Sequence, residues 1–158
     1  MQNISRQEKL VQYANDYAEL AAFLKTLSKE QIAYKPGPDK WSAHEIMVHI
    51  ADAEANSYVR VRRAVAEPGG TVMPYEQDIW VKELNYAGLD MAEHLELFRL
   101  LRKLNHDLVK DLPEEKWQNQ YSHPQYGMVN LDSWLDIYAK HVSGHIAQIK
   151  RNMDAMEA

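Results

Sequence analysis

Four stretches in which apolar residues recur every three or four positions constrain the fold of this chain most strongly. The spacing matches the helical repeat of about 3.6 residues, whereas a half-buried strand alternates at every second residue. The stretches cover about residues 5–28, 42–67, 90–110 and 130–153, and no strand pattern competes with them. We therefore predict an all-α fold, a four-helix bundle.

The residues that open these stretches are typical of helix N-termini. Ser5 and Ser42 each stand three residues before a glutamate, the spacing of a capping box in which the serine oxygen and the glutamate carboxylate accept backbone N–H groups. Asp90 and Asn130 are caps of the simpler kind, in which one side-chain oxygen accepts from the helix backbone. All four predicted helices therefore have a marked start.

Proline and glycine separate the helices. A Pro-Gly-Pro run follows the first helix, and Pro68 stops the second, because proline lacks the backbone donor of a helix interior. The stretch 71–89 then has no sustained period. A long connection that contains aromatic residues is more often a packed crossover or a lid than disorder. We expect this long loop between the second and third helices to roof a pocket with Tyr75, Glu76 and Trp80.

Length and composition exclude several classes of protein. A chain of 158 residues suits one domain, which we place at 1–158, since roughly 70% of its surface can be buried on folding. The absence of cysteine excludes disulfides, thiolate nucleophiles and thiolate metal sites. A net charge of −5 with interspersed signs argues against nucleic acid as a partner. Because no apolar run approaches the ~20 residues of a membrane span and the start lacks a signal pattern, we expect no membrane contact and a cytoplasmic location.

Three histidines on two of the predicted helices are the strongest sign of chemistry. His141 and His145 are four residues apart, so on a helix their Cβ atoms lie about 5–6 Å apart on one face. His49 lies among apolar residues of the second helix. In a simple up-and-down bundle these two helices run parallel and bring the imidazoles to similar heights, although the long loop can change the order. Three histidines form a ligand set that leaves a divalent metal ion with open positions.

Histidines near an apolar face also have a plainer interpretation. Buried polar side chains usually have satisfied hydrogen bonds within the core, so the three histidines can be structural instead. The remaining histidines, which are His44, His94, His106 and His123, are interpreted as solvated or structural. Among these four, only His123 is a candidate to help shape the site.

Polar residues follow His49 on the same face of its helix. Asp52 comes three residues later, and its carboxylate can accept the imidazole N–H or a proton from a nucleophile. Asn56 and Arg60 continue the row, and we expect the amide to orient a substrate and the cation to bind an anionic thiol. The alternative for Asp52 and Arg60 is an ordinary solvated side chain.

A succession of short motifs runs through most of the chain, from about residue 36 to 150. In order these are Lys40-Trp41-Ser42 with Glu45 and His49, Ala51-Asp52, Asn56-Ser57-Tyr58 with Arg60, Met73-Pro74-Tyr75-Glu76 with Trp80, His123-Pro124 with Gly127, and His141 with His145-Ile146. At these residues the chain resembles the DinB-like superfamily, and more closely its YfiT-like branch, which includes bacillithiol transferases. Each motif is weak by itself, but their order is fairly specific.

The resemblance implies a four-helix bundle in which His49, His141 and His145 bind a divalent metal ion, often zinc or nickel, commonly in a homodimer. It also implies a metal-dependent enzyme, either a hydrolase or a transferase that joins a low-molecular-weight thiol to an electrophile. This chain departs from the pattern at Val48 and Gln148, where that branch often has further histidines. Gly144 likewise departs beside the last ligand, so the ligands are kept while the substrate stays open.

These observations converge on metal-assisted activation of a nucleophile. Because the chain has no cysteine, a thiol nucleophile must arrive as a cosubstrate. We predict an enzyme that uses the three-histidine ion to activate a small thiol or water, as a thiol S-transferase or hydrolase in detoxification or stress response. The alternative is a non-catalytic dimeric helical bundle that binds a metal or a small ligand.

Overall fold

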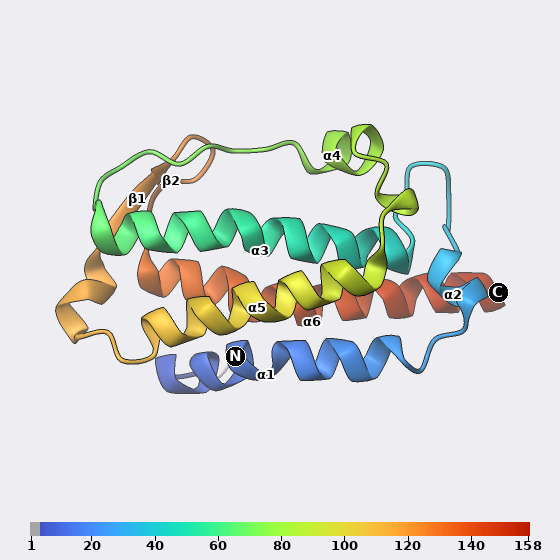
Figure 1. The fold of residues 1–158 in the computed structure, drawn as a ribbon, viewed down its shortest axis with the longest axis horizontal. Coiled ribbons are helices and arrows are strands. Elements are labelled where there is room, and N and C mark those ends of the chain that lie inside the picture. Colours follow the sequence, from blue (N-terminus) through green and yellow to red (C-terminus); the bar gives the residue numbers. More distant parts are fainter. Residues whose placement is uncertain (1–3) are drawn as a thin grey trace.

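The computed structural model describes residues 4–158 and confirms the predicted helical bundle. Met1 to Asn3, the first residues of the predicted domain, lie outside the described part. The long helices lie alongside one another (Figure 1). They are α1 (Arg6–Leu24), α3 (Ala43–Ala66), α5 (Met91–Val109) and α6 (Leu131–Glu157). All four begin next to the caps that the sequence predicts.

The first helix is shorter than predicted. Ser5 forms the expected capping box with Glu8, but α1 ends at Leu24 rather than near residue 28. Ser28 is itself the N-cap of a separate short helix, α2 (Lys29–Ala33), with a capping box that includes Gln31. A second start signal inside the periodic stretch therefore divides it into two helices.

The helices that carry the histidines run antiparallel, so the expected parallel arrangement is wrong. Near the C-terminal end of α6, Asn152 donates to the carbonyl of Trp41, which lies just before α3. Near the other end of α6, the indole of Trp134 donates to Ser57. The long connection after α3 returns along the length of the bundle (Figure 1), so α5 begins at the same end as α3 and α6 runs back.

The connection between α3 and α5 is an ordered layer rather than an irregular loop. It contains α4 (Gln77–Glu83) and the 3₁₀ turn η1 (Tyr86–Gly88). Val81 and Tyr86 pack with Val48 of α3 in a small apolar cluster. The predicted crossover is therefore fixed against the outer side of α3.

A small β-hairpin, which the sequence pattern does not predict, precedes α6. Strand β1 (Gln120–His123) follows the 3₁₀ turn η2 (Glu114–Gln118) and pairs antiparallel with β2 (Gly127–Asn130). Four-residue strands are too short to show a clear alternation, which explains why the expectation of no strand is wrong. Gly127 has a φ of +72° at the turn, a conformation that glycine adopts without strain.

The apolar core has two parts with a polar layer between them. One part lies toward the hairpin and includes Trp134, and the other lies toward α2 and includes Ile46 and Phe98. Along α3 and α5, the buried charged residues Glu54 and Arg102 fall between these parts. Each long helix therefore contributes apolar residues at both ends and polar ones near its middle.

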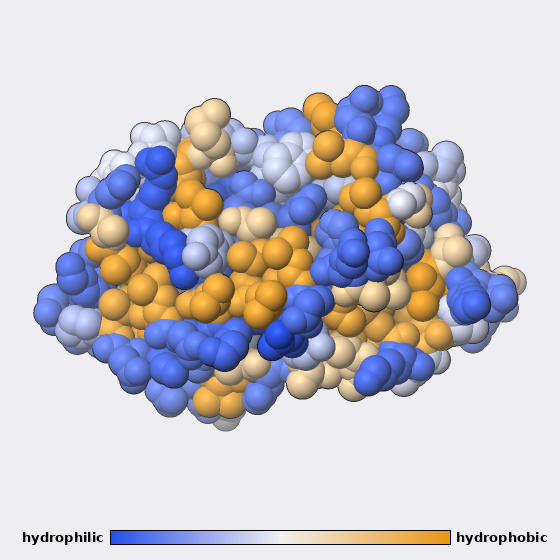
Figure 2. Space-filling model, viewed as in Figure 1, coloured by the Kyte–Doolittle hydropathy of each residue, from blue (hydrophilic) through white to orange (hydrophobic). Residues whose placement is uncertain are grey.

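The surface has a mixed character. Figure 2 shows apolar side chains gathered along α5 on one face of the molecule, where Leu97, Leu100 and Leu104 are exposed. Within residues 4–158, none of the helices combines the length and apolar character that a bilayer crossing demands. The predicted homodimer and the predicted location stay predictions.

Candidate metal centre

The three predicted histidines meet inside the bundle. Three ring nitrogens, one each from His49, His141 and His145, all lie within 4.8 Å of one another. The ring centroid of His49 is 5.4 Å from that of His141 and 4.9 Å from that of His145. His141 and His145 approach through their Nε2 atoms, which are 3.1 Å apart. Helices far apart in the sequence thus direct three imidazoles at one point.

The nitrogens of this cluster lack the protein partners that a structural histidine has. His49 is 1% exposed, and neither of its ring nitrogens has a hydrogen-bond partner among residues 4–158; the same holds for Nδ1 of His141. Leaving a buried polar atom without a partner costs about 1–3 kcal/mol. The orphaned atoms argue for an absent ligand and against the plainer structural interpretation.

Burial keeps the three imidazoles neutral, which is the form that binds a metal ion. It lowers the pKa of His49 to about 3, with a smaller contribution from His145. Burial also lowers the pKa of His141 well below its usual value, together with the neighbouring His145 and His49. The pKa of His145 falls for the same reason, although Gln148 opposes the shift. Protons therefore compete weakly with a cation at neutral pH.

Two neighbours hold the rings in place. Nδ1 of His145 lies 2.8 Å from Oε1 of Gln148, and since an amide oxygen only accepts, Nδ1 carries the proton. That tautomer leaves a lone pair on Nε2, which faces His141. Trp41 packs on His49 at a centroid distance of 4.9 Å. Gln148, a position where the resemblance leads one to expect histidine, thus orients a histidine of the cluster.

The donor set fits a divalent transition metal. Neutral imidazole suits zinc, nickel, copper and iron, and three histidines leave coordination positions for water or substrate. No other group of three or more histidine, cysteine, aspartate or glutamate residues in the described part of the chain has this geometry.

A buried ionic cluster, which the sequence does not predict, adjoins the histidines. Arg102 of α5 donates to Asp16 of α1 at 2.6 Å and to Glu54 of α3 at 2.8 Å. Tyr13 and Asn105 both donate to Oε1 of Glu54. One cation thus faces two carboxylates, and burial raises the pKa of Asp16 to about 7 despite Arg102.

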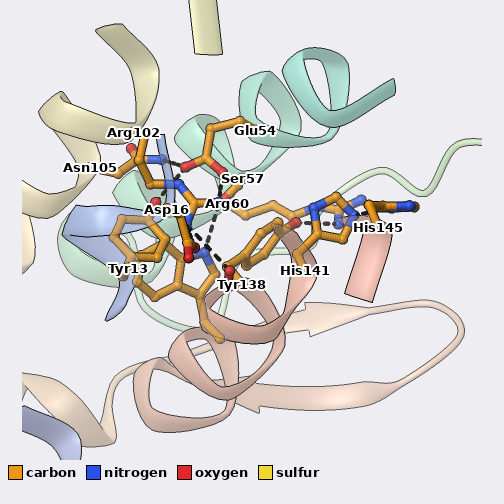
Figure 3. Close-up of polar contacts among 11 residues, drawn as sticks. Tyr13, Asp16, Glu54, Ser57, Arg60, Arg102, Asn105, Tyr138, His141 and His145 are labelled. Atoms are coloured by element: carbon orange, nitrogen blue, oxygen red, sulfur yellow. Dashed lines mark hydrogen bonds and ion pairs between the residues drawn. The ribbon is translucent and has the colours of Figure 1, made fainter. Parts of the chain in front are cut away.

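Tyr138 connects this cluster to the histidines (Figure 3). Its backbone carbonyl accepts from Arg102 at 3.4 Å, and its hydroxyl accepts from Arg60 at 3.3 Å. Its ring lies 6.0 Å from that of His141, one turn further along α6. The ionic cluster therefore fixes the part of α6 from which His141 projects.

A cavity of about 110 Å³ opens beside His141. Side chains from four parts of the fold line it, including Arg60, Tyr75, Tyr121, His123 and Tyr138. Burial raises the pKa of Tyr75, Tyr121 and Tyr138, so these phenols stay protonated and can donate hydrogen bonds. The expectation that Tyr75 helps to roof a pocket agrees with this placement.

The three tentative site residues lie in different surroundings. The Asp52 carboxylate accepts from the hydroxyl of Tyr86 at 2.5 Å, so the expected hydrogen bond to His49 is not formed among residues 4–158. Asn56 donates to the backbone carbonyl of Asp52 and lines a separate groove under Trp80. Arg60 is the one that reaches the cavity beside His141. Their catalytic roles stay predictions.

His123 is more involved than sequence reasoning indicates. It is buried and lines the cavity, whereas His44 and His94 bond to backbone carbonyls as expected of structural residues. The sequence also contains a signal for Tyr138 as a site residue, because it lies three residues before His141 on the same helix face. Tyr121 could not, because it lies on the unpredicted hairpin.

Comparison with known proteins identifies the family. The sequence model that describes the DinB superfamily matches residues 12–149 of this chain. The chain belongs to the DinB superfamily. Among curated relatives, a protein of Oceanobacillus iheyensis with the provisional name metal-dependent hydrolase is 28% identical over 144 residues, which are 87% of this chain and 82% of the relative.

Solved structures share the fold. YfiT from Bacillus subtilis, described provisionally as a metal-dependent hydrolase with an unusual four-helix bundle topology, superposes with a TM-score of 0.88. It is 22% identical, and the match covers 99% of this chain and 92% of YfiT. A mycothiol-dependent maleylpyruvate isomerase superposes with a TM-score of 0.73 at 12% identity, over 92% of this chain and 61% of the isomerase. The resemblance to the DinB and YfiT-like proteins is thereby confirmed.

Proposed function

We propose that this protein is a metal-dependent thiol S-transferase, with hydrolysis by the same site as the second candidate. The observation that carries the proposal is the convergence of three neutral imidazoles, in which both ring nitrogens of His49 and Nδ1 of His141 are buried without a hydrogen-bond partner among residues 4–158. His49, His141 and His145 would hold the ion, with zinc or nickel as the proposed metals. When bound, such an ion lowers the pKa of a thiol or water that contacts it, which creates a nucleophile near neutral pH.

The chain's own residues then bind the reactants and take up the proton. The cavity beside His141 receives part of the small-molecule substrate, and Arg60 attracts a negative group on it. In the transfer reaction a C–S bond forms and a carbon–halogen bond breaks, halide leaves, and the thiol proton passes to a base. Asp52 is the proposed base, and the hydroxyl of Tyr86 fixes its carboxylate.

A thiol is preferred over water for two reasons. The chain has no cysteine, so a sulfur nucleophile must come from solution. One structural neighbour is an isomerase that depends on the thiol mycothiol.

The hydrolase candidate is supported by the provisional names of the curated relatives. A non-catalytic metal-binding bundle is the third candidate, and a site with open coordination positions argues against it.

The test compares thiol consumption with and without metal. The protein, loaded with zinc or nickel, is incubated with a chloronitrobenzene and a panel of thiols that includes bacillithiol and cysteine, and thioether formation is followed by absorbance. We expect a rate that a chelator abolishes and that added metal restores. A parallel reaction with a nitrophenyl ester and no thiol measures the hydrolase candidate.

Variants provide the matched control. His141→Ala removes a proposed ligand, whereas His94→Ala removes a histidine of α5 that bonds to the backbone of Asp90. We expect the first variant to lose the activity and the second to keep it. A rate of thioether formation that neither the chelator nor His141→Ala changes would contradict the proposal.

A further inference from the structure

An arginine without an acidic partner lies beside the metal centre. Arg60 donates to two neutral oxygens, the hydroxyl of Tyr138 at 3.3 Å and the backbone carbonyl of Met73 at 3.1 Å. No carboxylate of residues 4–158 forms an ion pair with it, whereas Arg63, on the next turn of α3, pairs with Glu67. A half-buried guanidinium in contact with neutral groups alone retains its capacity to bind an anion.

The cavity that Arg60 lines is rich in hydrogen-bond donors. Tyr121 is 2% exposed and lines the cavity, and because burial raises the pKa of its phenol, the hydroxyl keeps its proton. His123 accepts on Nδ1 from the backbone N–H of Gln125, which leaves the proton of its neutral ring on Nε2. A guanidinium, a phenol and an imidazole N–H together form a set that suits an oxyanion rather than a cation.

The charges of the site favour the same kind of ligand. Three neutral imidazoles leave the charge of a bound divalent ion uncompensated, and Arg60 adds a further positive charge. Asp52 supplies one negative charge nearby, but its carboxylate is engaged by Tyr86. An anionic substrate would balance the remaining positive charge. The site is partly shielded from water, so attraction between opposite charges is stronger there than in water.

The volume of the cavity and the residues at its opening further limit which ligands fit. A cavity of about 150 Å³ holds benzene, so the roughly 110 Å³ found here admits a group of carboxylate size rather than a whole cosubstrate. Tyr126 and Ile137, which also line the cavity, are 70% and 47% exposed. An apolar body attached to the anionic group can rest on these exposed side chains.

We propose that the cavity between Arg60, Tyr121 and His123 binds a carboxylate of the substrate, so that this enzyme acts on carboxylate-bearing molecules with an apolar body. The inference rests on the proposed function, because it names the substrate class of the same site. The carboxylate can belong to the electrophile or to the thiol.

Binding is tested first, without any turnover. Calorimetry on the metal-loaded protein compares benzoate with benzamide, a neutral molecule of nearly the same shape. We expect benzoate to bind at least tenfold more tightly than benzamide. Arg60→Gln should remove that preference and Arg60→Lys should keep part of it, while Arg63→Gln, the control on the same helix, should leave it unchanged. The Arg60→Lys variant retains the charge and keeps the test valid if Arg60→Gln fails to fold.

Two results would overturn the inference. One is equal binding of benzoate and benzamide by the unaltered protein. The other is a benzoate affinity that both Arg60 variants leave unchanged but that disappears in the His141→Ala variant, because the carboxylate would then bind the ion alone. If no thiol or ester is turned over while Arg60-dependent binding persists, the proposed function fails and the anion site stands.

Kinetics separate the two sources of the carboxylate. A chloronitrobenzoate is compared with the matching chloronitrobenzamide, and cysteine is compared with cysteamine, which lacks the carboxylate. Arg60→Gln should raise KM for the carboxylate-bearing member of one pair by tenfold or more and leave the member without a carboxylate unaffected. The pair that responds identifies the reactant whose carboxylate occupies the cavity, and a response in neither pair contradicts the proposal.

Discussion

Replacement of Arg102 by methionine should destabilise the protein strongly. The guanidinium is 1% exposed and is the cation that pairs with both Asp16 and Glu54. Removing one partner of a buried ionic network typically costs about 3–5 kcal/mol, because the opposite charges stay buried without compensation. For a domain of this size, about 1 kcal/mol shifts the Tm by roughly 2–4 °C. We therefore expect Arg102→Met to lower the Tm by about 6–20 °C.

Urea unfolding followed by far-UV circular dichroism measures the free energy directly. Arg99→Met is the matched control, since Arg99 lies on the same helix and pairs with Glu96 at the surface, where an ion pair contributes at most about 1 kcal/mol. The loss in Arg102→Met should also be smaller at about pH 5.5 than at about pH 8. Without the arginine, the buried Asp16 carboxyl has a pKa above the unfolded value of about 4 and binds a proton in the folded state. A loss within about 1 kcal/mol of the Arg99→Met control, at both pH values, would refute this account of the cluster.

Three further predictions concern the metal centre. In chelator, the unaltered protein should lose about 2 kcal/mol more stability than the His49→Gln variant when the pH falls from about 7.5 to about 5. The His49 ring has a pKa near 3 in the folded protein and about 6.5 in the unfolded chain, so at pH 5 only the unfolded chain binds this proton. Urea titrations at each pH check this, and parallel curves would contradict it. Gln148→Leu should weaken metal binding by about 10–100-fold, whereas Gln148→Glu keeps the acceptor for His145 and should not; competition with a metal-sensitive dye measures both affinities. Zinc at about 1,000 times its Kd should stabilise the unaltered protein by about 4 kcal/mol in thermal melts and should not stabilise His141→Ala.

Local signals in the sequence predict the helices and the histidine cluster well. The capping boxes at Ser5 and Ser42 mark their helix starts because the pattern acts over three residues. The pair His141 and His145 is visible because one turn of helix separates its members. The position of His49 in the cluster follows from its apolar surroundings and from the resemblance, although the helices proved antiparallel.

Long-range pairings account for what the sequence does not predict. Asp16 and Arg102 are 86 residues apart, and nothing near either residue identifies its partner. Asp52 bonds to Tyr86 instead of His49 because the crossover places a phenol against α3. The hairpin that carries Tyr121 and His123 is held partly by the chain after α3, through the backbone pair of Ser122 and Gly70. Such contacts depend on topology, which local periodicity does not encode.

The metal content of the purified protein tests the central claim most directly. Elemental analysis of protein prepared without chelator should find close to one divalent transition-metal ion per chain. The His141→Ala variant should contain almost none while its helical circular dichroism persists, and His94→Ala should match the unaltered protein. Undiminished metal in His141→Ala, or no metal in the unaltered protein even after incubation with zinc or nickel, would contradict the three-histidine site.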